Sequence, residues 1–225
     1  MPPANHADTQ GSEPIGLGLE RIVFFSDAVM AIAITLLVID LKLPGVPPPA
    51  TAAEVAAALR QLTPRIVSFV ISFAVISVYW SSHHRYFSFI RRYDSRLMVL
   101  NLVFLFFIVL MPFAASMLGQ YSYLPVGVVI YGLAVAATGL SMGAIWWYAS
   151  RNHRLVEGGL DPKMIQGRNR IALIIPLLFL ASLPWAFVSP LIPPAIWWVA
   201  PFVALLASRR LGLNRRADAG GHIAR

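Results

Sequence analysis

Residues 21–44 read RIVFFSDAVMAIAITLLVIDLKLP, an apolar stretch that carries ionisable side chains within it. A helix of about 20 apolar residues crosses the hydrocarbon core of a bilayer. Ionisable side chains are costly inside such a helix, so they indicate a function or a specific assembly rather than a simple anchor. The polar side chains of this stretch include Arg21, Ser26, Asp27, Thr35 and Asp40. We therefore expect this first helix to take part in function or assembly.

The composition of the whole chain is that of a membrane protein. Of its 225 residues, 58% are hydrophobic and 12% are charged, whereas soluble domains carry about 25% charged residues. A soluble fold would have too little polar surface to cover this apolar mass. The chain has no Cys, which excludes disulfides, thiolate metal sites and a cysteine nucleophile.

Six apolar segments predict an all-α, polytopic membrane protein with six transmembrane helices. They cover residues 19–43, 65–82, 97–118, 124–148, 171–188 and 194–207. The last two are short and interrupted by prolines, and residues 52–62 are expected as a separate short surface helix. Residues 1–20 contain no Lys or Arg, unlike a secretory signal peptide, so the first helix is expected to be retained.

Three regions follow from this organisation. We expect a polar tail at residues 1–17, a transmembrane domain at 18–208 and a basic tail at 209–225. Basic residues gather after the second and fourth helices and in the final tail, which places both termini in the cytoplasm by the positive-inside rule. This arrangement accounts for the net charge of +8 without nucleic acid as a partner. We expect the protein in the cell membrane, with an aromatic belt of Trp146, Trp147, Trp185, Trp197 and Trp198.

Helical periodicity divides the first helix into two faces. At 100° per residue, one stripe about 100° wide contains Phe25, Ala28, Ile32, Thr35, Leu36 and Ile39. Asp27 lies about 140° from Ile32, and about 120° separate Arg21 from Asp27, so these two charges do not pair within the helix. Their partners must lie on neighbouring helices or on another subunit. Periodicity alone leaves the stripe open between lipid contact, bundle core and a functional surface.

Enzyme and metal chemistry have little support in the residues. No HExxH or GxSxG pattern occurs, and no histidine stands at helical spacing from Ser26 and Asp27 to act as a base. With five His and no Cys, we predict no metal site, no cofactor and no catalytic residue. For His83 and His84, fixed hydrogen bonds are favoured over titration that gates a channel.

Three motifs carry a resemblance to a known family. R-x-x-x-F-S-D at residues 21–27, followed by AIAITLLVIDLKLP, resembles the first helix of the transmembrane protein 175 family. These proteins are the endolysosomal potassium channels and their prokaryotic relatives. The resemblance extends to YWSSHHRYF at 79–87 and NLVFLFFIVLMPF at 101–113. It covers residues 18–115 by motif, and the remainder is similar only in architecture.

The resemblance implies a passive, potassium-permeable cation channel. Prokaryotic members are tetramers in which helix 1 of each subunit lines a central pore, and they lack the TVGYG carbonyl filter, as this chain does. The family pattern of apolar rings with a hydroxyl ring nearby falls on Ile32, Thr35, Leu36 and Ile39. We expect the apolar rings to close the path by dewetting and Thr35 to meet potassium transiently. The family also suggests proton permeation, which these residues do not decide.

The resemblance further assigns the polar residues of helix 1 to assembly. Arg21, Phe25, Ser26 and Asp27 form the assembly motif that holds helix 1 to its neighbours. The candidate packing partners are Trp80, His83, His84 and Asn101. Asp40, about 80° from Ile32, is expected at the outer mouth, where its charge attracts cations. The expected partners are potassium ions, the lipid bilayer and three further copies of the chain.

Two other functions remain as alternatives. A secondary transporter is compatible with the Pro-rich fifth and sixth helices, although residues 18–115 and 120–210 show no convincing internal repeat. A membrane assembly protein without conduction is the third possibility. Saturable flux that depends on a coupled ion would favour the transporter, and absence of flux would favour the assembly protein.

Overall fold

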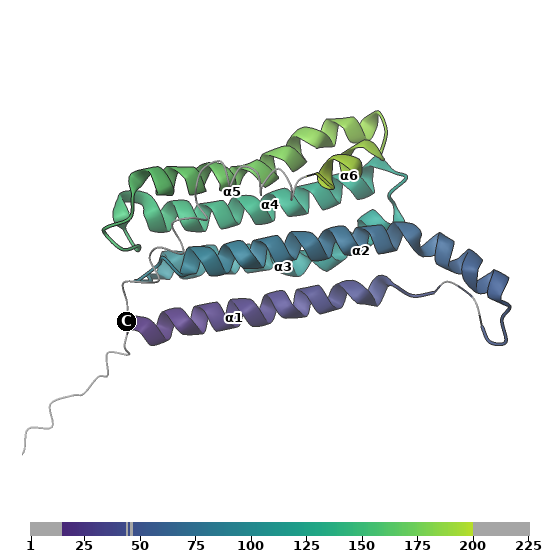
Figure 1. Cartoon of the computed structure of the whole chain (residues 1–225), viewed down its shortest axis with the longest axis horizontal. Helices are drawn as coiled ribbons and strands as arrows, with labels where there is room; N and C mark the ends of the chain where they lie inside the picture. Colours follow the sequence, from purple (N-terminus) through teal and green to yellow (C-terminus); the bar gives the residue numbers. More distant parts are fainter. Residues whose placement is uncertain (1–14, 44, 46, 200–225) are drawn as a thin grey trace, which may run out of the picture.

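A computed structural model describes residues 15–43, 45 and 47–199 of the chain. Its long helices are α1 (Ile15–Leu36), α2 (Ala52–Phe87), α3 (Ser95–Gln120), α4 (Pro125–Ser150) and α5 (Pro162–Ser182). Shorter elements are α6 (Ile192–Trp197) and the 3-10 helices η1 (Leu37–Asp40), η2 (Arg151–His153) and η3 (Leu183–Phe187). Successive long helices run in opposite directions, with α1 along one edge, α2 and α3 in the middle and α4 and α5 beyond them (Figure 1).

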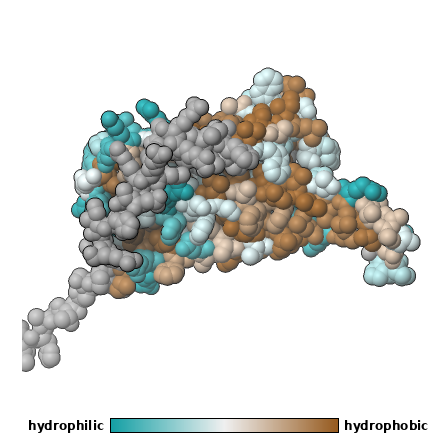
Figure 2. Space-filling model, in the orientation of Figure 1, coloured by the Kyte–Doolittle hydropathy of each residue, from teal (hydrophilic) through white to brown (hydrophobic). Residues whose placement is uncertain are grey.

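Within the described residues, five helical segments are long and apolar enough to cross a membrane, so the protein is an all-α, multi-pass membrane protein. These segments are Leu17–Asp40, Ala52–Phe87, Ser95–Gln120, Pro125–His153 and Pro162–Phe187. Figure 2 shows hydrophobic residues over the middle of the bundle. The predicted sixth span begins within α6, but its residues 200–207 lie outside the described residues, as does the predicted basic tail at 209–225. Of the predicted N-terminal tail, residues 15–17 belong to α1 and residues 1–14 are not described.

The second long helix differs from its prediction. A separate surface helix at residues 52–62 was expected before a span at 65–82, but α2 is one helix of 36 residues with Pro64 inside it. A capping box starts it: the Thr51 backbone N–H donates to the Glu54 carboxylate (2.8 Å), and the Glu54 N–H donates to the Thr51 hydroxyl (3.3 Å). Pro64 is exposed, so the carbonyl that it leaves unpaired can face water. At about 1.5 Å per residue, α2 is longer than the bilayer core is thick, and its first turns project beyond the bundle (Figure 1).

The core is centred on α4, which packs between α3 and α5. Trp146 and Trp197 are fully buried there, whereas Trp147, Trp185 and Trp198 are about half exposed. The expected aromatic belt is therefore wrong for Trp146 and Trp197. Stacking on other rings holds both in the core: Trp146 lies 4.9 Å from Tyr86 and Trp197 lies 4.7 Å from Phe179, between ring centroids.

Two glycines one turn apart on α4 have different surroundings. A Cβ atom at Gly139 would lie 2.5 Å from Pro176 Cγ of α5 and 2.6 Å from the Tyr79 hydroxyl of α2. The Tyr79 hydroxyl is fixed, since it donates to the Val135 carbonyl at 2.8 Å. A Cβ atom at Gly143 would meet only Ala172, at an ordinary 3.7 Å.

Gly139→Ala is therefore expected to destabilise the protein by about 1–3 kcal/mol through overpacking. Gly143→Ala is the matched control and is expected to leave stability unchanged. Thermal unfolding of the purified variants in detergent tests this difference. Equal melting temperatures for the two variants would contradict the close contact of α4 with α2 and α5.

Candidate functional site

The first helix has one face packed against the bundle. Its buried side chains recur every three or four residues, at Ile22, Ser26, Met30, Ala33 and Leu37, which is the spacing of one helical face. This face packs on α2 and α3. Because α1 lies at the edge of the bundle (Figure 1), no other described helix of this chain packs on its other face.

The predicted pore stripe lies on the uncovered face. The exposed fractions are 59% for Ile32, 42% for Leu36 and 52% for Ile39, and Thr35 is also exposed. The Thr35 hydroxyl donates to the Ile32 carbonyl at 2.8 Å. Its hydrogen is thus engaged within the helix, and its oxygen lone pairs remain available to a cation. Phe25, 55% exposed, belongs to the same uncovered face.

A buried chain of hydrogen bonds joins α1 to α3 and α2. The Asn101 amide donates to the Ser26 hydroxyl at 2.9 Å, and Ser26 donates to the Ile22 carbonyl at 2.8 Å. On its other side, Asn101 Oδ1 lies 2.9 Å from His83 Nε2. Since that oxygen is an acceptor, His83 carries its hydrogen on Nε2. Ser26, His83 and Asn101 are each at most 2% exposed, so these bonds form where water does not compete.

The charged residues of the motif lie at the edges of this packed face. The Trp80 indole N–H donates to the Asp27 carboxylate at 2.9 Å. His84 is exposed and stacks on Trp80, with ring centroids 6.2 Å apart. Asp27 and His84 line a groove of about 380 Å³ on one side of α1. Arg21 lines a second groove, of about 290 Å³, on the other side.

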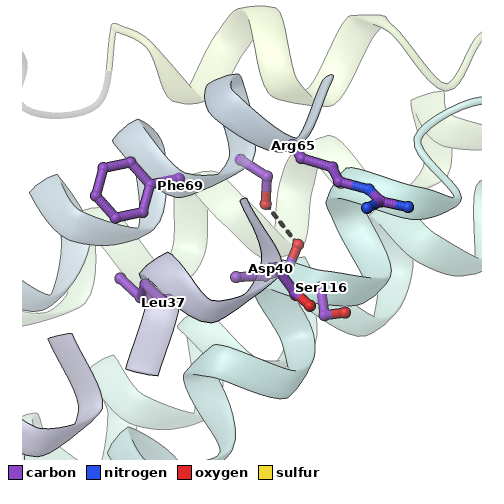
Figure 3. Close-up of a pocket in the computed structure, with 8 residues that line it drawn as sticks. Leu37, Asp40, Arg65, Phe69 and Ser116 are labelled. Atoms are coloured by element: carbon purple, nitrogen blue, oxygen red, sulfur yellow. Dashed lines mark hydrogen bonds between the residues drawn. The ribbon is translucent and has the colours of Figure 1, made fainter. Parts of the chain in front are cut away.

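Asp40 lies at the opposite end of α1 from Arg21. It is the last residue of η1 and lines a cavity of about 10 Å³ between η1, α2 and α3, close to the space of one water molecule. Figure 3 shows Leu37 and Phe69 on one side of this cavity and Asp40, Arg65 and Ser116 on the other. Beside this cavity, the Ser68 hydroxyl of α2 donates to the Ala115 carbonyl of α3 at 2.6 Å.

The connections α2–α3 and α4–α5 meet at one end of the bundle, which we call the basic end. Its segments, residues 85–96 and 151–170, hold nine Arg or Lys and three carboxylates, and Figure 2 shows hydrophilic residues gathered there. Backbone N–H groups of Arg91 and Arg92 donate to the Leu155 carbonyl at 2.9 and 3.2 Å. Sequence reading located these charges but not the contact between the two connections.

Asp94 organises part of the basic end. It caps α3 by accepting from the Leu97 N–H at 2.9 Å, accepts from the Tyr148 hydroxyl at 2.6 Å, and lies 3.7 Å from Arg154. Partial desolvation acts to raise the pKa of Asp94, but these hydrogen bonds and the positive charge outweigh it and hold the pKa below the ordinary value. The ionised form is therefore the stabilising one.

Acidification is expected to destabilise the wild type more than Asp94→Asn. The ordinary aspartate pKa is about 4, so the contribution of ionised Asp94 is present at neutral pH and is lost as the pH falls through its lowered pKa. Melting temperatures of both proteins between about pH 6 and about pH 3 measure the effect. An identical decline in both would show that Asp94 is not responsible.

Metal binding has no support in the part of the chain that the structure describes, where no group of three or more His, Asp or Glu side chains is placed to hold an ion. Among those residues, the candidate functional features are the exposed stripe of α1 and the hydrogen-bond chain behind it.

The sequence analysis missed two features of the structure, the start of α2 and the partner of Asp94. The T-x-x-E signal at residues 51–54 would have indicated the start of α2, whereas no local pattern pairs Asp94 with Tyr148.

Comparison with known proteins identifies relatives along most of the chain. The family model for the endosomal/lysosomal potassium channel TMEM175 matches residues 21–112. A potassium channel of Streptomyces collinus is 36% identical over 158 residues, which are 68% of this chain and 75% of the relative. A potassium channel of Chamaesiphon minutus is 32% identical over 172 residues, which are 75% of this chain and 84% of the relative.

A solved structure has the same fold. The crystal structure of a lysosomal potassium-selective channel TMEM175 homolog from Chamaesiphon minutus superposes with a TM-score of 0.72 at 26% sequence identity. The match covers 87% of this chain and 98% of that chain. The motifs of α1, α2 and α3 and the arrangement of the helices thus agree with the sequence comparison, and the family is one of ion channels rather than enzymes. The chain belongs to the TMEM175 family.

Proposed function

We propose that this chain is a potassium-permeable channel of the cell membrane and that α1 lines a central pore in a homotetramer. The observation that carries the proposal is the uncovered stripe of Ile32, Thr35, Leu36 and Ile39 on a helix whose opposite face is packed. Lipid covers most exposed apolar side chains of a membrane bundle, but this row also carries the exposed Thr35 hydroxyl, and a ring of identical helices around a narrow path brings both to the ions. The bacterial relatives named potassium channels support the permeant ion and the membrane.

Conduction in such a ring depends on hydration rather than on a carbonyl filter. Rings of Ile32, Leu36 and Ile39 close the path by dewetting, and a small rotation or dilation of α1 admits water and ions. Thr35 lies between them with its hydroxyl hydrogen donated to Ile32, so a ring of Thr35 oxygens accepts a partly dehydrated cation. The expected preference for potassium over sodium is weaker than that of channels with a carbonyl filter.

The remaining residues act around this path. The chain Ser26–Asn101–His83 and the Trp80–Asp27 bond hold α1 against α3 and α2, while Arg21, Phe25 and His84 face the grooves or the uncovered side. We assign Asp40, at the end of α1 away from the basic end, to the outer mouth. This assignment follows from placing the basic end and both termini in the cytoplasm, with a sixth span near the C-terminus.

Ion flux into proteoliposomes tests the function. The purified protein is reconstituted, and potassium, sodium and proton uptake are measured against empty vesicles. We expect non-saturating potassium flux that exceeds sodium flux. Saturable flux coupled to a second ion would identify a transporter instead. No flux from protein that is folded and oligomeric by size-exclusion chromatography would leave a membrane assembly protein.

A further inference from the structure

Arg168 of α5 is a buried cation that the proposed ion path does not use. It is 4% exposed and stands six residues from the start of α5, about 9 Å along the helix. Its guanidinium carbon lies 4.5 Å from the ring centroid of Phe89 and 5.8 Å from that of Trp146. These rings interact favourably with a cation but cannot accept its hydrogen bonds as a carboxylate does.

The acids of the basic end are engaged elsewhere. Glu157 pairs with Arg91 at 3.6 Å and Asp94 with Arg154 at 3.7 Å. Asp161 caps α5 by accepting from the Lys163 N–H at 2.8 Å. Within the described ranges no carboxylate pairs with Arg168. The ionisable side chains that act on it are Tyr86, a phenol that is uncharged at neutral pH, and Arg85, a like charge. A buried charge without a counterion is strongly unfavourable.

Two further buried donors, both on α4, are also without partners in the described part of the chain. In the described part of the chain, Arg168 Nε, Trp146 Nε1 and Ser150 Oγ are all buried atoms with no hydrogen-bond partner. Trp146 and Ser150 are four residues apart and share one face of α4. Buried polar groups are nearly always satisfied, so a buried cation against the Trp146 ring, with unpaired donors on the same face of α4, indicates an acceptor that carries negative charge.

We propose that Arg168, Trp146 and Ser150 form a site for a phosphate group at the basic end of the bundle. The planar guanidinium matches phosphate oxygens in a fork geometry, and the indole N–H and the hydroxyl supply further donors. A buried cation between transmembrane helices near the headgroup region is suited to the phosphate of an anionic lipid. The same chemistry also fits free phosphate, so the experiment distinguishes the two sources.

Lipid-dependent stability of the full chain in a non-ionic detergent tests the site. Phosphatidylglycerol is expected to raise the melting temperature of the wild type. Phosphatidylcholine has the same phosphate but adds a cation that Arg85 repels, so it is expected to have little effect. Arg168→Met should weaken the apparent affinity for phosphatidylglycerol by at least about tenfold, while Arg170→Met, which removes an exposed charge from the same helix, should not. Inorganic phosphate that reproduces the rise would make free phosphate the ligand.

Ser150→Ala separates binding from folding. This change removes a buried hydroxyl that has no partner within the described chain, so the lipid-free protein should melt at or above the wild-type temperature. Its affinity for phosphatidylglycerol should nevertheless fall several-fold. Equal lipid-induced shifts in the wild type, Arg168→Met and Ser150→Ala would overturn the site, as would equal losses in Arg168→Met and Arg170→Met. Absence of any shift in the wild type with both lipid and phosphate would also overturn it.

Discussion

Ile39→Asn is expected to raise potassium flux through the reconstituted protein by at least about tenfold. Ile39 is 52% exposed on η1, which continues α1, and the proposed tetramer would repeat it four times around the path. An apolar ring excludes water and therefore ions, and an amide ring provides hydrogen bonds that keep water in place. If each of four amides gains a net hydrogen bond of about 0.5 kcal/mol, the barrier falls by about 2 kcal/mol, or roughly thirtyfold in rate.

Val38→Asn is the matched control for this experiment. Val38 is adjacent in sequence and equally exposed, at 54%, but it lies outside the stripe. The two variants thus place the same side chain at neighbouring positions with nearly the same exposed fraction. Raised flux in Ile39→Asn alone supports the pore assignment. Wild-type flux in Ile39→Asn, or an equal rise in both variants, would place the pore on another surface.

Asn101→Leu is expected to destabilise the protein by about 2–4 kcal/mol. Leu has a similar volume, so the change leaves little cavity but removes both hydrogen bonds of the amide. Ser26 then loses its donor and His83 Nε2 loses its acceptor, and both side chains are fully buried. An unsatisfied buried group costs about 1–3 kcal/mol, although hydrogen bonds between membrane helices often contribute less.

A double-mutant cycle with Ser26→Ala separates the hydrogen bond from other effects. Once Asn101 is replaced, the Ser26 hydroxyl no longer accepts a bond from α3, so Ser26→Ala should cost less in that background than in the wild type. We expect a coupling of about 0.5–2 kcal/mol from thermal or chemical unfolding in detergent. Additive losses would show that Ser26 and Asn101 act independently and would remove the proposed anchor of α1.

Several features of this protein follow from local pattern and are visible in the sequence. The apolar runs give α1 with η1, α3 and α4 to within a few residues, because a membrane span must satisfy its own backbone and be about 20 residues long. The helix α5 begins at Pro162, nine residues before its predicted span at 171–188. Helical periodicity separates the buried and uncovered faces of α1 for the same local reason. The break predicted between residues 62 and 65 was wrong because Pro64 removes only one hydrogen bond, and its exposed position within α2 tolerates that loss.

The pairing of side chains was decided only by the tertiary structure. The sequence indicated that Ser26 and Asp27 need partners on other helices. Only the packing of α1 on α2 and α3 shows that Asn101 donates a hydrogen bond to Ser26 and that Trp80 donates one to Asp27. The burial of Trp146 and of Arg168 was likewise not visible, because span-end tryptophans and basic loop residues ordinarily face the interface. Periodicity states which face a residue occupies on its own helix. How deeply that face is buried and which residues contact it depend on where the other helices lie, and this information is not local in the chain.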